Sequence, residues 1–129
     1  MALLTRDQLL APDPVRHHQF SCGAVDVRIR NLTEGEKSKF ENSILTSKGS
    51  LSVSKLDLAR CRLIALCVVD AQGRRLLSDA DAEALLEKDG ALTARIYDEC
   101  RKHCGFDEDD IETLAKNSDR IAGGSSQSD

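Results

Sequence analysis

The residues of this 129-residue chain that are best suited to chemistry are Cys100, His103 and Cys104. On a helix, spacings of three and four residues place two thiols and an imidazole on the same side, where all three could ligate one metal ion. Cys100 and Cys104 also continue an apolar stripe that begins with Leu92 and Ile96. Small thiols on such a stripe are typical of a hydrophobic core. We therefore expect core residues, and a small metal-binding regulatory domain is the alternative.

Other motifs that could indicate chemistry lack some of the residues that they require. A closed zinc site needs a fourth ligand, and Cys22, His17 and His18 do not stand at a paired spacing for it. The acidic run 107–110 lacks the central Gly and the Glu at position 12 of a calcium loop, so it is typical of a charged helix start. The chain has no glycine-rich phosphate loop outside its last residues and no Gly-x-Ser-x-Gly turn. We expect a protein that is not an enzyme and has no cofactor.

Length and charge set the broad class. A chain of this length fits one domain that can bury a core without metal or disulfide support. Residues 1–64 carry ten Lys or Arg against seven Asp or Glu, whereas residues 65–129 carry eight against fifteen. Phosphate binding needs clustered positive charge, and stacking aromatic residues are scarce at 3% of the chain. We expect no nucleic-acid partner, while the segregated charge permits self-association.

Cysteine content and hydropathy bear on location. The five cysteines are an odd number, and the first residues lack the basic and apolar regions of a signal peptide. Reduced thiols in a cytoplasm are the simple interpretation. The longest apolar run, 63–69, is far shorter than the roughly 20 residues of a membrane-spanning helix. We expect a cytoplasmic protein with no membrane partner.

The first half of the chain contains two helix starts and a clear strand. Thr5 and Gln8 have capping-box spacing for a short helix through Leu10, and Thr33 with Glu36 repeats that spacing. Between them, residues 15–24 are compatible with a strand and a turn. The segment 25–30 alternates apolar and polar residues, which predicts a strand with its core side on Val25, Val27 and Ile29.

The second half is mainly helical. Ser54 with Asp57 predicts a helix start, and the segment 66–77 predicts a hairpin that turns at Gly73. Ser78 is expected to cap a helix through Glu87. A helix from about Ala91 to His103 should stop at Gly105, and a last helix should carry its core residues on one side: Ile111, Leu114 and Ala115.

These elements predict one mainly helical α+β domain over residues 1–117, followed by a flexible, disordered tail over 118–129. The predicted sheet is small and antiparallel, with strands at 25–30, 66–70 and 74–77. The loop 46–54, rich in small hydroxyl residues, is either a simple connector or a segment that a partner orders.

Two stretches resemble one protein family. Residues 27–41, with Thr33, Glu36 and Phe40, and residues 65–81, with Asp70, Gly73 and Leu76, are similar to the tail assembly chaperones of long-tailed bacteriophages. In that family a strand leads to a Leu-Thr-x-x-Glu helix start, and a Val-Asp-x-x-Gly hairpin precedes a capped helix. Leu77 stands where the family usually has an aromatic residue.

The resemblance implies a non-enzymatic protein of the host bacterial cytoplasm that acts during virion tail morphogenesis. Such a protein binds the tape measure protein, helps recruit the tail tube protein and often forms homo-oligomers. A chaperone of this kind needs apolar surface beyond what its own core uses. The partner-binding candidates are Ile44, Leu45, Leu51, Val53, Leu85 and Leu86. The alternative is that all of them are internal core.

Overall fold

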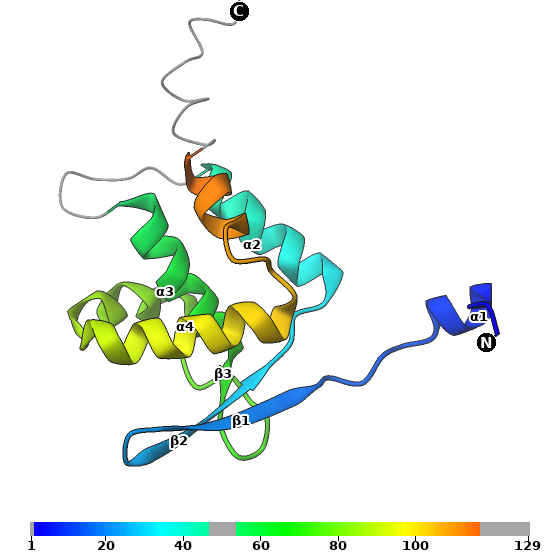
Figure 1. Cartoon of the computed structure of the whole chain (residues 1–129), viewed down its shortest axis with the longest axis horizontal. Helices are drawn as coiled ribbons and strands as arrows, with labels where there is room; N and C mark the ends of the chain where they lie inside the picture. The colour runs from blue at the N-terminus through cyan, green and yellow to red at the C-terminus, as the bar shows by residue number, and fades with distance from the viewer. Residues whose placement is uncertain (1, 47–53, 117–129) are drawn as a thin grey trace, which may run out of the picture.

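The computed structural model describes residues 2–46 and 54–116 (Figure 1). The predicted tail, the greater part of the loop 46–54 and the candidates Leu51 and Val53 lie outside these residues. The elements, in chain order, are α1 (Arg6–Leu10), β1 (His17–Cys22), β2 (Val25–Arg30), α2 (Glu34–Thr46), α3 (Lys55–Cys67), β3 (Val68–Val69), the 3-10 helix η1 (Asp79–Glu87) and α4 (Gly90–Cys104). A further helix covers residues 110–116. The α+β prediction, mainly helical with a small antiparallel sheet, is confirmed.

The sheet differs from the predicted one in its third strand, and β3 is also shorter than the strand predicted at 66–70, because residues 66 and 67 belong to α3. Its order is β1-β2-β3, and the hairpin of β1 and β2 turns at Gly23, which has a φ of 65°. The segment 74–77 is not a strand, because it meets β3 only through the bridge between Val69 and Arg75. The Arg75 guanidinium donates to the Ala65 carbonyl at 2.9 Å, so the returning chain lies over the end of α3. The strand that completes the sheet is β1.

Strand β2 has the predicted bounds, but its core side is shorter than predicted. Ile29 is fully buried and Val27 is partly buried, whereas Val25 is 60% exposed. The alternation places all three on one face. Val25 lies beside the hairpin turn and lines an open hollow that α4 borders, so the prediction that it is a core residue is wrong.

The helix starts follow the predicted capping residues. Thr33 Oγ1 accepts the Glu36 N–H at 3.1 Å, and the Glu36 carboxylate accepts the Thr33 N–H at 2.9 Å, which completes a capping box. Ser54 caps α3 by accepting the Asp57 N–H. At the C-terminal end of α4, Gly105 closes the helix in the left-handed conformation with a φ of 83°.

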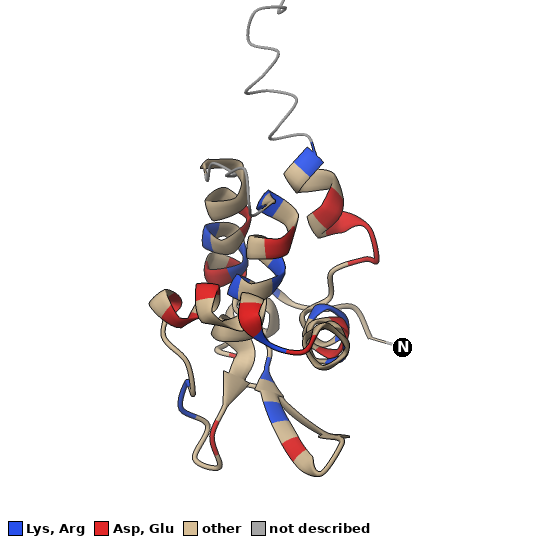
Figure 2. Cartoon of the chain, turned by 90° about the vertical axis from the view of Figure 1, so that its left-hand side faces the viewer, with Lys and Arg blue, Asp and Glu red and all other residues tan. Residues whose placement is uncertain are grey.

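One predicted helix has another geometry. The segment from Ser78 to Glu87 forms η1 instead of an α-helix. The Ser78 N–H donates to the Asp81 carboxylate at 2.8 Å, so the predicted start holds. The acidic run 107–110 is a helix start as well, because the Asp107 N–H donates to the Asp110 carboxylate at 2.7 Å. Figure 2 shows this run as the red segment that leads into the last helix.

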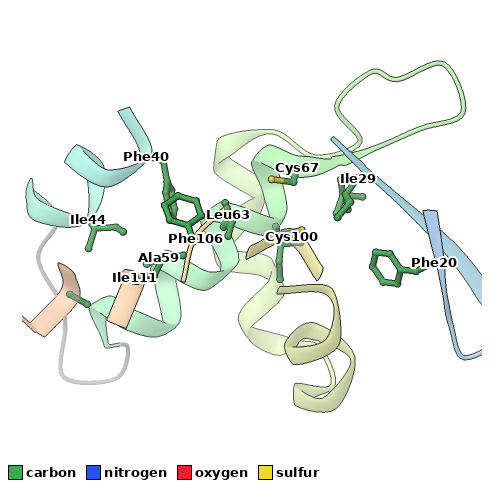
Figure 3. Close-up of a cluster of buried hydrophobic side chains, with 13 residues drawn as sticks. Phe20, Ile29, Phe40, Ile44, Ala59, Leu63, Cys67, Cys100, Phe106 and Ile111 are labelled. Atoms are coloured by element: carbon green, nitrogen blue, oxygen red, sulfur yellow. The ribbon is translucent and has the colours of Figure 1, made fainter. Parts of the chain in front are cut away.

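The core lies between the helices and the inner face of the sheet (Figure 3). Helix α3 runs through its centre and contributes Ala59, Leu63 and Cys67. Phe40 of α2 and Phe106 meet edge to face, with ring centroids 5.7 Å apart. With so few aromatic residues, small aliphatic side chains and thiols fill most of the remaining volume.

Candidate docking groove

A largely apolar hollow lies between the β1–β2 hairpin and α4. We call it the hairpin groove; its volume is about 310 Å³, and its main apolar residues are Val25, Val27, Leu76, Leu85, Leu92 and Ile96. Val25 and Leu76 are each 60% exposed. Large apolar side chains that share one open groove are typical of a surface that binds another protein.

The turn at Asp70 positions Leu76 in this groove. Its carboxylate accepts the N–H groups of Gln72 and Arg74 at 2.9 and 3.0 Å, and Gly73 supplies the left-handed residue with a φ of 82°. The hydrogen bond from the Arg74 N–H, with the smaller one from Gln72, lowers the pKa of Asp70. After the turn, the Leu76 N–H donates to the Val68 carbonyl, which brings Leu76 beside the sheet.

A second hollow of about 290 Å³ adjoins the groove and shares Leu85 with it. Leu86 lies in this second hollow, between α3 and α4. There the Arg60 guanidinium lies over the Tyr97 ring, 5.4 Å from its centroid. Burial raises the pKa of Tyr97. The partly buried pair Leu85 and Leu86 is thus placed where two surface hollows meet.

The other predicted partner-binding residues lie elsewhere. Ile44 is fully buried in the core and offers no surface to a partner in this structure. Leu45, the next residue of α2, is 43% exposed and does not line the hairpin groove. The structure therefore brings together Leu85 and Leu86 but separates them from Ile44 and Leu45.

Sequence reasoning missed Val25 and Leu76 as surface residues. Strict alternation assigned Val25 to the core, and the hairpin pattern assigned Leu76 to a strand. A usable signal for Val25 was its position directly after the Gly23-Ala24 turn, because the end of a hairpin is often uncovered. The turn before Leu76 was predicted, but no local pattern showed that Leu76 would stay exposed after it, because its exposure depends on how distant parts of the chain pack.

Cys67, Cys100 and Cys104 form a thiol cluster, and His103 is not part of it. The sulfur atoms of Cys67 and Cys104 lie 3.5 Å apart, and Cys67 and Cys100 are fully buried. A hydrogen bond with Cys100, together with burial, raises the pKa of Cys67, and the bond with Cys67 raises the pKa of Cys104. All five thiols are free. Protonated, buried thiols are typical of inert core cysteines.

His103 points away from this cluster. Its Nε2 lies 2.9 Å from the Arg16 carbonyl, and its ring stacks on that of His18 with centroids 5.8 Å apart. His18 in turn lies 3.1 Å from a carboxylate oxygen of Glu99. Over residues 2–46 and 54–116 no three ligand side chains are grouped to hold a metal ion. The histidines instead join the start of β1 to α4.

Over residues 2–46 and 54–116, no helix combines the length and apolar character that crossing a membrane requires.

Comparison with family models finds no match for the chain, and searches of curated proteins and of solved structures find no significant similarity either.

Proposed function

We propose that this protein is a non-enzymatic tail assembly chaperone of the long-tailed phage type, which binds the tape measure protein and helps recruit the tail tube protein in the host cytoplasm. The hairpin groove is the observation that carries this proposal. It offers exposed Val25 and Leu76 beside partly buried Leu85, Leu92 and Ile96. A long apolar helix, the chemistry implied for the tape measure client, fits such a groove by inserting side chains at a spacing of three and four residues.

The composition of the groove suits a holding function. A chaperone must bind many similar apolar segments and discriminate only weakly among them, so aliphatic contacts serve better than a polar network. All six apolar groove residues named above are aliphatic, and the charged residues of its lining are Asp26, Arg28 and Lys88. Binding in such a groove depends on the burial of apolar surface and has little specificity for the sequence of the client.

One of the two motifs that carry the family resemblance shapes this surface. Asp70 and Gly73 form the turn that presents Leu76. Thr33 with Glu36 starts α2 directly after β2, at the end of the strand away from the groove. The Asp70 turn therefore supports the proposal through the position that it gives to Leu76.

Co-expression with the cognate tape measure protein tests the proposal. We expect the chain to raise the soluble fraction of that client several-fold, and Leu76→Asp to abolish the gain because a charge then stands in the apolar groove. Thr113→Asp, which adds the same charge on an exposed position of the last helix, is the matched control and should behave as wild type. An unchanged solubility of the client with the wild-type chain would refute the proposal.

A further inference from the structure

The first residues form an arm that packs little against the rest of the domain. We define the N-terminal arm as residues 2–16, all of which are exposed. Its helix α1 has no buried residue, and Leu3, Leu4, Leu9 and Leu10 are between 62% and 91% exposed. Figure 1 shows α1 standing apart from the body of the domain. Four leucines on one short arm are an apolar surface that the described chain leaves uncovered.

The arm is nevertheless built to a definite shape. Thr5 and Gln8 form a complete capping box, with hydrogen bonds of 3.1 and 2.9 Å. Leu4 and Leu9 stand at the two positions of a hydrophobic staple, directly before the cap and four residues after it. A helix of five residues is marginal in water by itself, because helices shorter than about 12 residues rarely hold without packing. A capped helix of this length with exposed leucines is therefore typical of a segment whose leucines pack against a surface outside the arm.

The root of the arm directs it away from the groove of its own domain. Arg16 is fixed at the C-terminal end of α4, where its guanidinium donates to the His103 carbonyl and its own carbonyl lies 2.9 Å from the His103 ring. The hairpin groove lies toward the other end of α4, at Leu92 and Ile96. Pro12 and Pro14 favour an extended linker between α1 and this root. Figure 1 shows the arm and the tip of the hairpin at opposite sides of the domain.

From this placement we propose that the N-terminal arm of one copy docks in the hairpin groove of a second copy, in a reciprocal exchange that forms a two-fold dimer. Each copy then contributes an arm of fifteen residues and a groove lined by fourteen. A standard stable interface uses about 20–30 residues on each side, so the two surfaces together reach the size that a dimer needs. Two identical arms and two identical grooves satisfy each other in a closed assembly.

Charge is compatible with this pairing. Residues 2–15 of the arm carry Asp7, Asp13 and Arg6, whereas the groove carries Arg28, Lys88 and Asp26. The free part of the arm is thus slightly acidic and the groove slightly basic. Docking brings together net charges of opposite sign and covers apolar surface on both partners.

The exchange deepens the proposed function and rests on the same groove. An arm from the partner covers Val25 and Leu76 while no client is present, and a client helix must displace it. The arm then acts as a competitor for the client, so loss of the arm contacts should free the groove without damaging it.

The test compares the oligomeric state of full-length variants by size exclusion with light scattering. We expect the wild-type chain to be a dimer. The dissociation constant of the Leu4→Asp/Leu9→Asp dimer should be at least tenfold higher than that of the wild type. Thr113→Asp/Lys116→Glu should keep the wild-type affinity. Because Leu4 and Leu9 are exposed within their own chain, the arm variant should keep the wild-type melting temperature. A monomeric wild type, including one whose arm folds onto its own groove, overturns the proposal, and so does an arm variant that remains dimeric.

Mixing two defective chains gives a second, independent readout. The arm variant keeps its groove, and Leu76→Asp keeps its arm, so an equimolar mixture at high concentration should form a heterodimer through one arm and one groove. This heterodimer is weaker than the wild-type dimer because it has half of the interface, but it should appear at concentrations where neither variant dimerises alone. Absence of this heterodimer overturns the exchange. Client solubility separates the two proposals, because the arm variant should still hold the client if the groove binds it, whether or not the chains pair.

Discussion

Arg30 Nη1 donates hydrogen bonds to both carboxylate oxygens of Glu36, at 2.9 and 3.1 Å. Arg30 ends β2 and Glu36 lies in the first turn of α2, so this pair fixes the angle between strand and helix. The Nε of the same guanidinium donates to the Leu66 carbonyl at 3.2 Å near the end of α3. One cation therefore joins three elements of the domain.

Glu36→Gln should lower the free energy of unfolding by about 1 kcal/mol at pH 7, a value reduced for partial exposure of the pair. Burial raises the pKa of Glu36, but the hydrogen bonds from Arg30 and Thr33 outweigh it, so the net pKa lies below 4.5. The stabilisation is then present above pH 4.5 and is lost as the pH falls through the folded-state pKa. Urea unfolding at pH 7 and pH 3 should show the difference from wild type shrinking in acid.

Glu34→Gln is the control for that experiment, since Glu34 carries the same charge in the same turn and has only a 3.5 Å contact with Ser38. We expect a change of less than about 0.5 kcal/mol for it. Equal losses for the two variants would contradict the role given to Arg30.

Gly105→Ala should destabilise the domain by about 1–2 kcal/mol, because the φ of 83° is strained for any residue with a Cβ. No atom lies within 4 Å of the added Cβ, so the cost is one of backbone conformation alone. Thermal unfolding followed by circular dichroism measures it. Gly90→Ala at the other end of the same helix has equal space without a positive φ, and should be neutral or stabilising. A loss at Gly90 as large as at Gly105 would argue against this account.

Leu63→Ala should lower the free energy of unfolding by about 2–5 kcal/mol, because it opens a cavity at a fully buried position in the centre of the core. Leu76→Ala removes the same atoms from a side chain that is 60% exposed, and should change stability by less than about 0.5 kcal/mol. Chemical denaturation of both variants makes the comparison. A large loss at Leu76 would show that the groove residue belongs to the core.

Cys104 should react with iodoacetamide at pH 8 at least tenfold more slowly than Cys22, which is likewise partly buried. The contact with Cys67 raises the pKa of Cys104, and only the thiolate reacts. Mass spectrometry of digested, time-quenched samples gives the rates of both sites. In 8 M urea the two rates should converge, and a persistent difference there would point to a cause other than the fold.

Local signals account for most of the elements that the sequence predicts. The capping residues Thr5, Thr33 and Ser54 each start a helix, and Gly105 ends one. These signals work because capping depends on atoms within three or four residues along the chain. The bounds of β2 follow equally from its strict alternation.

Features that depend on contacts between residues far apart in the sequence could not be predicted from these local signals. The segment 74–77 keeps only one bridge to β3 while Arg75 binds the end of α3, and Val25 is exposed at the hairpin tip. The proximity of Cys67 and Cys104 joins residues 37 positions apart. The hairpin groove has the same origin, since its walls come from parts of the chain that no single pattern connects.

The position of Tyr97 has a practical consequence for every unfolding measurement on this protein. The chain contains no tryptophan and a single tyrosine, so its intrinsic fluorescence comes almost entirely from one ring. That ring lies under Arg60, between α3 and α4. The emission therefore reports when these two helices separate, and a disagreement with the circular dichroism signal would reveal a partly opened intermediate.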